Sequence, residues 1–358
     1  MSKPSVIVVG AGAAGIGAAR ALIEQGLSPV LLEARNRIGG RVFSQLLTAN
    51  LADADNENHV VIQLGANWVH ILLDSNPMYK IVKHLNLTLH TTSSDSEPGD
   101  DIVLFEKPGP TSNGTWSQVP KDSFTKACKR YDWIRENFER KIKENEVLDT
   151  SFDTMLEASK EIFGDIPDVE RRCFYWFFDR IAIDLNVPLS LAASDNYLEP
   201  DTAGNSGEAL IENGYHRVLQ HLAEEYPLDI RFEHEVISVD FEAASESGKI
   251  VRVECSNGSV FECNYCILTL PIGVLHDNTV RFTPSIPRSI AALCSEVVAG
   301  LMNVVWLWYP TIFWPEGCNF LGVAHDKDDP AEIGTFLIPP LKDNMGKRQP
   351  ILMVQVMH

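Results

Sequence analysis

A glycine-rich turn directly after a short apolar strand constrains the fold of this chain more than any other feature. The run Pro4 to Val9 is β-branched and bounded, which predicts a buried strand. It leads into Gly10-Ala11-Gly12-Ala13-Ala14-Gly15, with the spacing G-x-G-x-x-G, and then into helical spacing over Ile16 to Gln25. Gly26 is a plausible helix stop, and Val30 to Glu33 predicts the next strand. The opening therefore predicts a βαβ unit of the dinucleotide-binding kind.

Each residue of this turn has a predicted mechanical role. Gly10 permits the tight turn, Gly12 lets the backbone approach a pyrophosphate, and Gly15 lets helix and strand pack closely. Ala14 lies in the turn that opens the helix, where free N–H groups and the positive end of the helix dipole attract a pyrophosphate. Glu33 ends the second strand, where its carboxylate can accept hydrogen bonds from ribose hydroxyls. This motif alone does not choose between FAD and NAD.

The next stretch, Ala34-Arg35-Asn36-Arg37-Ile38-Gly39-Gly40-Arg41, resembles the extension that follows the ribose acid in FAD-dependent amine oxidases. The resemblance implies that the cofactor is FAD and that Arg35, Gly40 and Arg41 help to bind it. Physically, two more glycines allow another close approach of the backbone, and Arg41 can offer a charged fork to phosphate oxygens. A basic surface loop is the alternative interpretation.

The segment Leu64-Gly65-Ala66-Asn67-Trp68-Val69-His70 resembles the part of that family that passes beside the flavin ring and enters the substrate cavity. In the polyamine-oxidising branch this segment commonly ends in His, as it does here. The resemblance therefore implies that His70 is the catalytic residue that handles the substrate ammonium. A purely structural histidine is the alternative. The implied cofactor contacts are Leu64, Gly65, Ala66, Asn67 and Trp68.

Further motifs extend the resemblance over nearly the whole chain. Ile211-Glu212-Asn213-Gly214-Tyr215 matches the return to the FAD domain, and Val236 matches the strand whose backbone meets the adenine. Thr269 to Leu275 and Phe313-Trp314-Pro315 match two more landmarks. The chain is thus similar to the flavin-containing amine oxidases, polyamine oxidase branch. This similarity implies an α/β fold, in which an FAD-binding Rossmann-type domain is interleaved with a substrate domain of helices and a mixed sheet.

The expected layout has four segments. Residues 1–90 form the first part of the FAD-binding domain, 91–205 a helical insert of the substrate domain, 206–275 the second FAD part, and 276–358 the substrate-domain sheet. An aromatic cluster, Phe174 to Phe178, is expected to be helix core rather than the wall of a cation site. The sequence predicts four further helices, over Lys121–Asn145, Phe152–Phe163, Val169–Ile183 and Ser289–Val298. It predicts strands over Ile230–Phe241, Lys249–Ser256, Val260–Leu270, Met302–Tyr309 and Ile351–Met357. Asn257-Gly258 predicts a hairpin turn between the second and third of these strands.

Composition narrows the partners. The formal net charge of −19 disfavours nucleic-acid binding and suits a cationic substrate, although solubility alone is an equally good explanation. No apolar run approaches the roughly 20 residues of a membrane span, and an apolar strand that begins almost at Met1 leaves no room for a signal peptide. A cytoplasmic protein is therefore expected. Cys263 and Cys266 form a C-x-x-C inside a predicted strand, which favours buried thiols over a redox or metal role.

The resemblance implies oxidation of an amine C–N bond, with a polyamine such as spermine or spermidine oxidised to an imine and O2 reduced to H2O2. One departure concerns a lysine that relatives carry in the strand before Phe-Trp-Pro, where it holds a water against the reactive flavin nitrogen. That position falls on Val304, and valine cannot hold that water. We therefore expect flavin reoxidation to be slow.

A second departure is the end of the sequence. The chain stops at His358, before the glycine-containing stretch and helix with which the family completes its FAD domain. Impaired FAD retention and marginal folding are therefore expected, and a fragment, a shortened gene prediction and a degenerate copy remain open. The alternative function is a catalytically impaired flavin-fold protein that binds nucleotide or polyamine without turnover. An NAD-dependent dehydrogenase and a histone-tail demethylase are disfavoured, and oligomeric state and any peroxisomal address are not indicated.

Overall fold

The computed structural model describes residues 5–48, 59–92, 101–108, 114–143, 166–185, 207–212, 214–245, 248–297, 300–326 and 333–357. The helix predicted over Phe152–Phe163, and Asn213 of the return motif, lie outside these residues. The chain forms two compact units. Unit 1 comprises Met1–Leu46, Val61–Asn67 and Asn213–Ala299, and unit 2 comprises Leu47–Val60, Trp68–Glu212 and Gly300–His358.

The predicted layout and the observed units differ at four places, since residues 47–60, 68–90 and 206–212 belong to unit 2 and residues 276–299 to unit 1. Strand pairing explains the two longest of these differences. Residues 68–90 belong to unit 2, because β5 (Trp68–His70) and β6 (Leu89–Thr92) both pair with β9 (Glu208–Ile211). Residues 276–299 belong to unit 1, where β15 (Arg281–Thr283) pairs with β11 (Val236–Ser245). Strand pairing, which a single sequence does not display, therefore sets both boundaries. The predicted mixed α/β class is confirmed.

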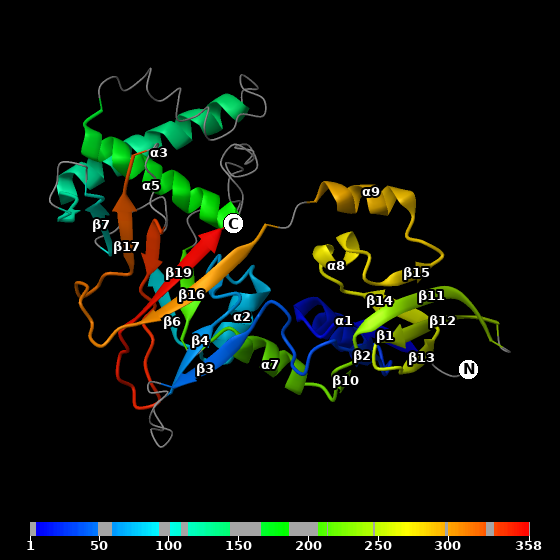
Figure 1. Ribbon diagram of the computed structural model, residues 1–358. Coiled ribbons are helices and arrows are strands. Elements are labelled where there is room, and N and C mark those ends of the chain that lie inside the picture. Colours follow the sequence, from blue (N-terminus) through cyan, green and yellow to red (C-terminus); the bar gives the residue numbers. More distant parts are fainter. Residues whose placement is uncertain are drawn as a thin grey trace. The chain divides into compact units, whose positions relative to one another are not determined.

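Unit 1 is built on a parallel sheet in the order β10-β2-β1-β14, with β1 at Val6–Val9, β2 at Val30–Leu32, β10 at Asp229–Arg231 and β14 at Tyr265–Leu268 (Figure 1). Val8 packs with Ala19 of α1 (Ala13–Glu24), whereas Val9 points into a second cluster with Val236. All four residues of β1 are buried. A strand that is covered on both faces needs side chains that are apolar without alternation, which explains the uninterrupted run in the sequence.

Helix α1 starts three residues before the predicted Ile16, because the last residues of the glycine motif are themselves helical. It ends as predicted, with Gly26 in the left-handed region at φ +75°. Its Arg20 side chain donates to the Leu222 carbonyl at 2.8 Å in α7 (His216–Glu224) and lies 4.8 Å from the ring centre of Tyr226. These contacts hold α1 and α7 together.

The second sheet of unit 1 has the order β13-β12-β11-β15, with β12 at Gly248–Cys255 and β13 at Val260–Cys263. The predicted hairpin is confirmed, since β12 and β13 are antiparallel and Gly258 has φ +86°. The prediction of single strands over Ile230–Phe241 and Val260–Leu270 was wrong, because each splits into two strands of different sheets. Apolar runs do not reveal such breaks. At the second break, Asn264 accepts a hydrogen bond from the Ser5 N–H at 3.0 Å. Helices α8 (Ile272–His276) and α9 (Arg288–Glu296) complete the unit.

The C-x-x-C pair lies across that second break, with Cys263 in β13 and Cys266 in β14. Burial raises the pKa of both thiols, that of Cys266 to about 12. The prediction of buried thiols is confirmed for Cys263, whereas Cys266 is half-buried. Within the described residues, no group of His, Cys, Asp or Glu side chains is arranged to hold a metal ion.

Unit 2 contains a mixed sheet in the order β16-β19-β18-β17-β7-β8 and a smaller one in the order β5-β9-β6 (Figure 1). The predicted strands at its end are confirmed, since β16 (Met302–Trp308) and β19 (Ile351–Met357) pair antiparallel along seven residues each. The remaining elements of unit 2 are β7 (Ile102–Glu106), β8 (Ser117–Gln118), β17 (Phe320–Ala324), β18 (Thr335–Leu337) and α2 (Pro77–His84). Strands β3 (Ser44–Thr48) and β4 (His59–Gln63) pair with each other, and the boundary between the units falls within both.

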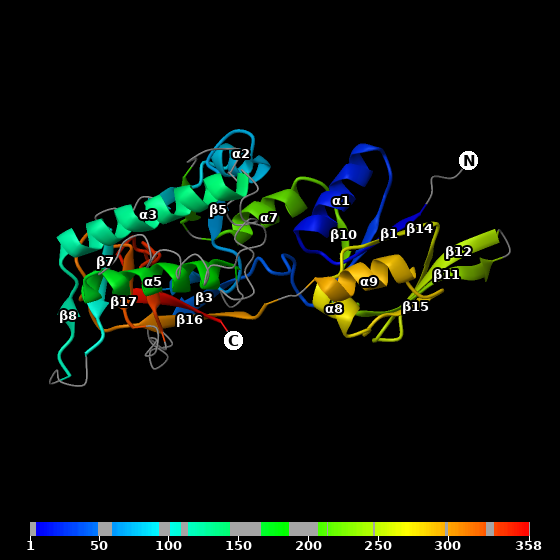
Figure 2. The ribbon, with the colours of Figure 1, turned by 90° about the horizontal axis from the view of Figure 1, so that it is seen from above.

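Helices α3 (Lys121–Lys143) and α5 (Asp168–Leu185) run side by side in unit 2 (Figure 2). The aromatic cluster Phe174 to Phe178 is buried between them and the sheet, and Phe177 stacks on Tyr131 of α3 with ring centres 4.7 Å apart. The prediction of a helix core is therefore confirmed for this cluster. Among the described helices, none is long and apolar enough to cross a membrane.

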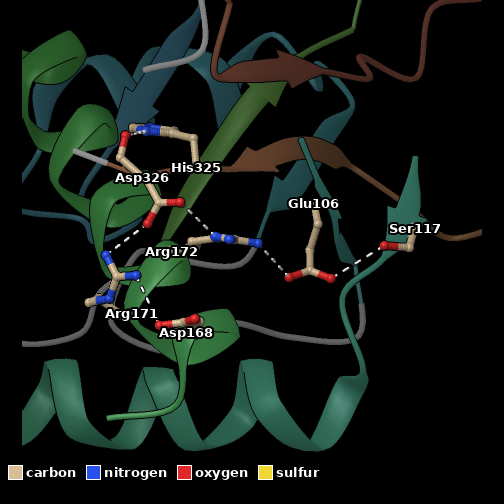
Figure 3. A network of polar contacts seen from close by, with 7 residues as sticks. All are labelled: Glu106, Ser117, Asp168, Arg171, Arg172, His325 and Asp326. Carbon is tan, nitrogen blue, oxygen red and sulfur yellow. Dashed lines mark hydrogen bonds and ion pairs between the residues drawn. The ribbon is translucent and has the colours of Figure 1, made fainter. Parts of the chain in front are cut away.

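A polar network ties the start of α5 to the ends of β7 and β17 (Figure 3). Asp326 pairs with Arg171 at 2.7 Å and with Arg172 at 3.0 Å, and Arg172 reaches Glu106 at 3.3 Å. Next to it, His325 is 3% exposed, with Nδ1 3.0 Å from the Asp326 carbonyl and Nε2 2.6 Å from the Asp179 carboxylate. Both ring nitrogens of His325 therefore face acceptors, which suits the doubly protonated imidazolium.

The pKa of His325 reflects these neighbours. Burial by itself lowers the pKa, but the hydrogen bonds to Asp179 and to the Asp326 carbonyl, with the charge of Asp179, raise it above the ordinary value of 6.5. A histidine whose pKa is higher in the folded state contributes stability below its unfolded pKa and loses it as the pH rises through the folded pKa. The network should thus stabilise unit 2 most in mildly acidic solution.

We predict that the thermal unfolding midpoint of the chain falls as the pH rises from about 6 to about 8. Asp179→Asn removes the carboxylate that favours the imidazolium, so this fall should be smaller in the variant. Differential scanning calorimetry at several pH values measures it. Asp122→Asn is the control, because Asp122 is an exposed carboxylate of α3 paired only with Lys126 among the contacts of the described residues. Equal pH slopes for Asp179→Asn and the wild type would contradict the prediction.

Candidate functional site

The glycine turn of unit 1 has a geometry that only glycine satisfies. Gly10 has φ +102°, and its N–H donates to the Leu32 carbonyl at 2.8 Å. A Cβ on Gly15 would lie 1.8 Å from the Gly10 carbonyl oxygen, which is far inside van der Waals contact. Thr269 closes the turn from the opposite end of the sequence, because its hydroxyl donates to the Val9 carbonyl at 2.6 Å. The sequence singled out the motif around Thr269 but not this contact.

The N-terminus of α1 suits an anion. Its N-cap is Gly12, which makes no side-chain capping bond, and no acidic residue lies in the first turn. Ala13 and Ala14 are exposed there. The first N–H groups of a helix have no partner inside the helix, and the dipole adds positive potential. Gly12 and Ala14 thus lie on a surface with the right chemistry for a pyrophosphate, whereas Gly15 is buried where helix and strand pack.

Glu33 is 7% exposed, and its carboxylate bonds to the backbone of the glycine turn. Its Oε2 accepts the Ala11 N–H at 2.7 Å, and its Oε1 accepts the Arg35 N–H at 3.0 Å. The carboxylate thus joins the glycine turn to the following arginine stretch. A carboxylate has about four acceptor sites, so two remain for hydroxyl donors such as those of a ribose.

The backbone beyond β10 lies along Glu33. The Glu33 N–H donates to the Arg231 carbonyl at 2.9 Å, and the Glu33 carbonyl accepts the His234 N–H at 2.9 Å. Val236 follows two residues later at the start of β11, with its side chain buried in the cluster that also contains Val9 and Leu32. The structure therefore brings the predicted adenine strand to the predicted ribose acid.

The second pair of glycines packs on the first turn. The Gly39 N–H donates to the Ala11 carbonyl at 2.9 Å, and a Cβ on Gly40 would lie 3.5 Å from the Gly12 Cα. The two glycine turns therefore pack into one surface, on which Gly12 and Gly40 are half-buried and Gly39 is buried. Arg37 supports it by donating to the Gly40 carbonyl at 3.1 Å and by lying 3.9 Å from the ring centre of Phe43. Burial, and then the charge of Arg35, lower the pKa of Arg37.

The predicted arginines have different surroundings. Arg35 is exposed and makes a long contact of 3.4 Å to the Gly40 carbonyl. Arg41 is also exposed, and among the described residues its side chain forms no hydrogen bond or ion pair. Arg37, which the prediction left out, is the arginine that shapes the loop. Arg35 and Arg41 are the two whose guanidinium groups remain available to phosphate oxygens.

The segment from Leu64 to Asn67 is held against the same loop. The Leu64 N–H donates to the Phe43 carbonyl at 2.8 Å, and the Ala66 N–H donates to the Arg41 carbonyl at 3.1 Å. A Cβ on Gly65 would lie 1.8 Å from the Arg41 carbonyl oxygen. Gly65 is therefore required by backbone packing, whatever lies on its other side. Leu64 and Ala66 are exposed, whereas Asn67 is buried.

Trp68 and Val304 lie in one apolar cluster of unit 2. Leu210, Phe320, Leu337 and Met353 form its buried centre, and Trp68, Val304 and Trp306 pack against them. Trp68 and Val304, which are 236 residues apart in the sequence, therefore pack against the same apolar cluster. At position 304 a valine continues this apolar surface, where a lysine would introduce a charge.

His70 ends β5, with its side chain 63% exposed. Its Nδ1 lies 2.6 Å from Oε1 of Glu208, which is its direct partner on the antiparallel strand β9. The Asn76 side chain, which also caps α2, donates to the His70 carbonyl at 2.6 Å. Ile71 has φ +60°, a strained conformation for a β-branched residue, and such strain often accompanies functional sites.

Glu208 and Asn76 contact His70 but were not predicted from the sequence. The signal for Glu208 was a carboxylate that opens an otherwise apolar strand, Ala209 to Ile211. A second imidazole–carboxylate pair lies on the same sheet, where His90 Nε2 is 3.1 Å from Glu212 Oε2. Glu212 also pairs with Lys342 at 3.4 Å. Strand β9 thus has a glutamate at its first residue and another just past its end, each beside a histidine.

A groove in the described part of unit 2 lies away from the predicted site residues. Its lining includes Trp308, Tyr309 and Arg348 and none of the predicted site residues. The predicted residues are placed instead by backbone and strand contacts. Those of unit 1 are Gly10, Gly12, Ala14, Gly15, Glu33, Arg35, Gly40, Arg41, Leu64, Gly65, Ala66, Asn67 and Val236, and those of unit 2 are Trp68 and His70.

Comparison with known proteins gives a consistent result. The sequence profile of a family described as flavin containing amine oxidoreductase matches residues 13–357. The chain is 31% identical to probable polyamine oxidase 4 of Arabidopsis thaliana, over 90% of the chain and 61% of that protein. It is 30% identical to polyamine oxidase 3 of Oryza sativa subsp. japonica, over 90% of the chain and 62% of that protein. Lysine-specific histone demethylase 1 homolog 3 of the same rice is 28% identical, over 93% of the chain and 38% of that protein.

The chain therefore spans about three fifths of the length of the polyamine oxidases that it matches. The matched family implies FAD as the cofactor. The residues of unit 1 fit that group on three counts. They offer an uncapped helix N-terminus, a glycine surface that any Cβ would interrupt, and a buried acid with acceptor sites to spare.

We predict that Glu33→Gln destabilises the cofactor-free chain by about 1–3 kcal/mol, because an amide NH2 would face either the Ala11 or the Arg35 N–H and leave that buried donor unpaired. Urea unfolding followed by circular dichroism measures the change. Glu296→Gln, at an exposed position near the end of α9, serves as the matched control. Unchanged stability in Glu33→Gln would show that the carboxylate does not hold the turn.

Proposed function

Because the chain belongs to the flavin-containing amine oxidoreductase family, we propose that it oxidises the C–N bond of a polyamine to an imine, with FAD as cofactor and O2 reduced to H2O2. The observation that carries this proposal is the pairing of a glycine-lined nucleotide surface with a segment, Leu64 to His70, that ends in an exposed histidine beside a carboxylate. The two relatives described above as polyamine oxidases support the substrate class.

The cofactor would be held by unit 1. The N–H groups at the start of α1 would face its pyrophosphate, Glu33 would accept from its ribose, and Arg41 would contact its phosphate oxygens. When bound, FAD supplies the oxidation itself, by taking a hydride equivalent from the carbon beside the amine nitrogen and passing electrons to O2. The protein supplies orientation, the exclusion of water and the handling of protons.

The substrate would be handled by residues of unit 2. A polyamine is cationic at neutral pH, but hydride departure needs a neutral nitrogen with a free electron pair. His70 is the proposed proton acceptor, and the face of Trp68 is an apolar wall that also attracts a cation. The net charge of −19 supports a polycationic substrate, because a negative field raises its rate of encounter.

The proposed compartment is the cytoplasm, with a role in polyamine catabolism. All seven cysteines are free thiols. Free thiols are the usual state in a reducing compartment, which supports a cytoplasmic location. We propose no nucleic-acid and no membrane partner, since an acidic chain repels both polyanionic surfaces.

The first test is the visible absorption spectrum of the purified, untagged chain after incubation with FAD and removal of the excess, before and after spermine under nitrogen. We expect a flavin band that bleaches with spermine, and release of H2O2 once air is admitted. A band that spermine does not bleach would replace the proposal with the alternative of a flavin-fold protein without turnover. A folded chain with no band would contradict FAD binding itself.

A second prediction concerns Val304. We expect Val304→Lys to raise the rate of flavin reoxidation, because an ammonium at this position can hold a water where valine cannot. Stopped-flow mixing of the reduced protein with O2 measures the rate. Val305→Lys is the matched control, since Val305 lies next to it on β16 but is exposed and outside the cluster of Trp68. An equal reoxidation rate in Val304→Lys and the wild type would contradict this prediction.

A further inference from the structure

The contact between His70 and Glu208 is set by strand register. Their Cα atoms are direct partners in the antiparallel pair β5–β9, and the side chains of such partners lie on the same face of the sheet. The two atoms in contact, Nδ1 of His70 and Oε1 of Glu208, are 2.6 Å apart. Backbone pairing thus keeps the carboxylate opposite one particular ring nitrogen.

We propose that Glu208 is the positioning residue of His70. An ionised carboxylate is only an acceptor, so it selects the tautomer in which Nδ1 carries the proton. A neutral imidazole in that tautomer has its electron pair on Nε2. Glu208 thereby makes Nε2 the atom that takes the proton from the substrate ammonium. This inference rests on the proposed function, which assigns that proton to His70.

The proton transfer balances in charge and electrons. The N–H bond of the ammonium breaks, a bond forms from that hydrogen to Nε2, and the electron pair of the broken bond stays on the amine nitrogen. His70 becomes an imidazolium whose Nδ1–H still faces the negative Glu208. The charge that develops on the ring is therefore met by a carboxylate already in place.

The main chain at His70 is held as firmly as the ring. Asn76 donates to the His70 carbonyl at 2.6 Å and to the Ile71 carbonyl at 3.3 Å, so the strained turn at Ile71 is fixed from the cap of α2. The nearby charged groups of the α2 segment, Lys83 and Asp74, pair with each other at 2.8 Å. Among these charges, Glu208 is the one in contact with the His70 ring.

The other histidine–glutamate pair of this sheet differs in two respects. Glu212 also pairs with Lys342, so its negative charge is shared with a cation. The His90 side chain is 26% exposed, against 63% for His70. A substrate therefore has less access to His90. The pair of His90 and Glu212 is a built-in control, with the same two residue types at the same sheet.

The first experiment is nitrogen-15 NMR of the histidine rings in the cofactor-free chain, which reports the tautomer directly. We expect the His70 ring to carry its proton on Nδ1 in the wild type at a pH where it is neutral. In Glu208→Gln that preference should relax toward a mixture, whereas in Glu212→Gln the His70 signals should not move. His70→Gln assigns the signals. A wild-type His70 protonated on Nε2 would overturn the proposal without any variant.

The second experiment follows flavin reduction by spermine under nitrogen as a function of pH. Glu208→Gln should slow reduction about 10- to 100-fold and move the acidic limb of the pH profile to lower pH, because the imidazolium has lost its countercharge. Glu212→Gln should leave rate and profile unchanged. A slowed rate with an unmoved profile would mean a merely structural role for Glu208. Spermine that fails to reduce the wild type would instead count against the proposed function, and the tautomer measurement would still decide the role of Glu208.

Discussion

The buried carboxylate of Glu33 is the interaction on which the nucleotide surface of unit 1 depends. One oxygen accepts from the glycine turn and the other from the arginine stretch, while the backbone of the same residue bonds to the segment that leads into β11. Three parts of the chain that begin at residues 10, 33 and 231 therefore meet at one residue. Glu33 is thus a structural residue in the folded chain as well as the proposed ribose acceptor.

Around that carboxylate, four backbone positions are occupied by glycine for two different physical reasons. At Gly15 and Gly65 a single added carbon would collide with a backbone carbonyl oxygen at 1.8 Å. At Gly12 and Gly40 an added carbon would have space, but it would cover the backbone surface on which a phosphate can lie. The four positions look alike in the sequence, yet two preserve packing and two preserve access.

The proposed role of unit 2 sets a different requirement, since an amine must be deprotonated before it is oxidised. Its sheets bring apolar side chains to one cluster with Trp68, and the cross-strand partner of His70 is a glutamate. The aromatic core of α3 and α5 and the ion-pair network of Figure 3 hold this unit together without using any of the predicted site residues. Structural and chemical roles are thereby divided among different side chains.

The sequence by itself determined what depends on neighbours along the chain. Residues Val6 to Leu32 predicted strand, turn, helix and strand, because glycine spacing and apolar periodicity are local properties, and the hairpin at Asn257-Gly258 followed from turn chemistry in the same way. Tertiary structure alone decided which segments pair. It split the apolar runs at 230–241 and 260–270 between sheets, assigned 68–90 and 276–299 to their units, and closed the glycine turn with Thr269. It also set Glu208 against His70, 138 positions away. No local pattern encodes such a contact, because strand register over that distance is set by the packing of the whole unit.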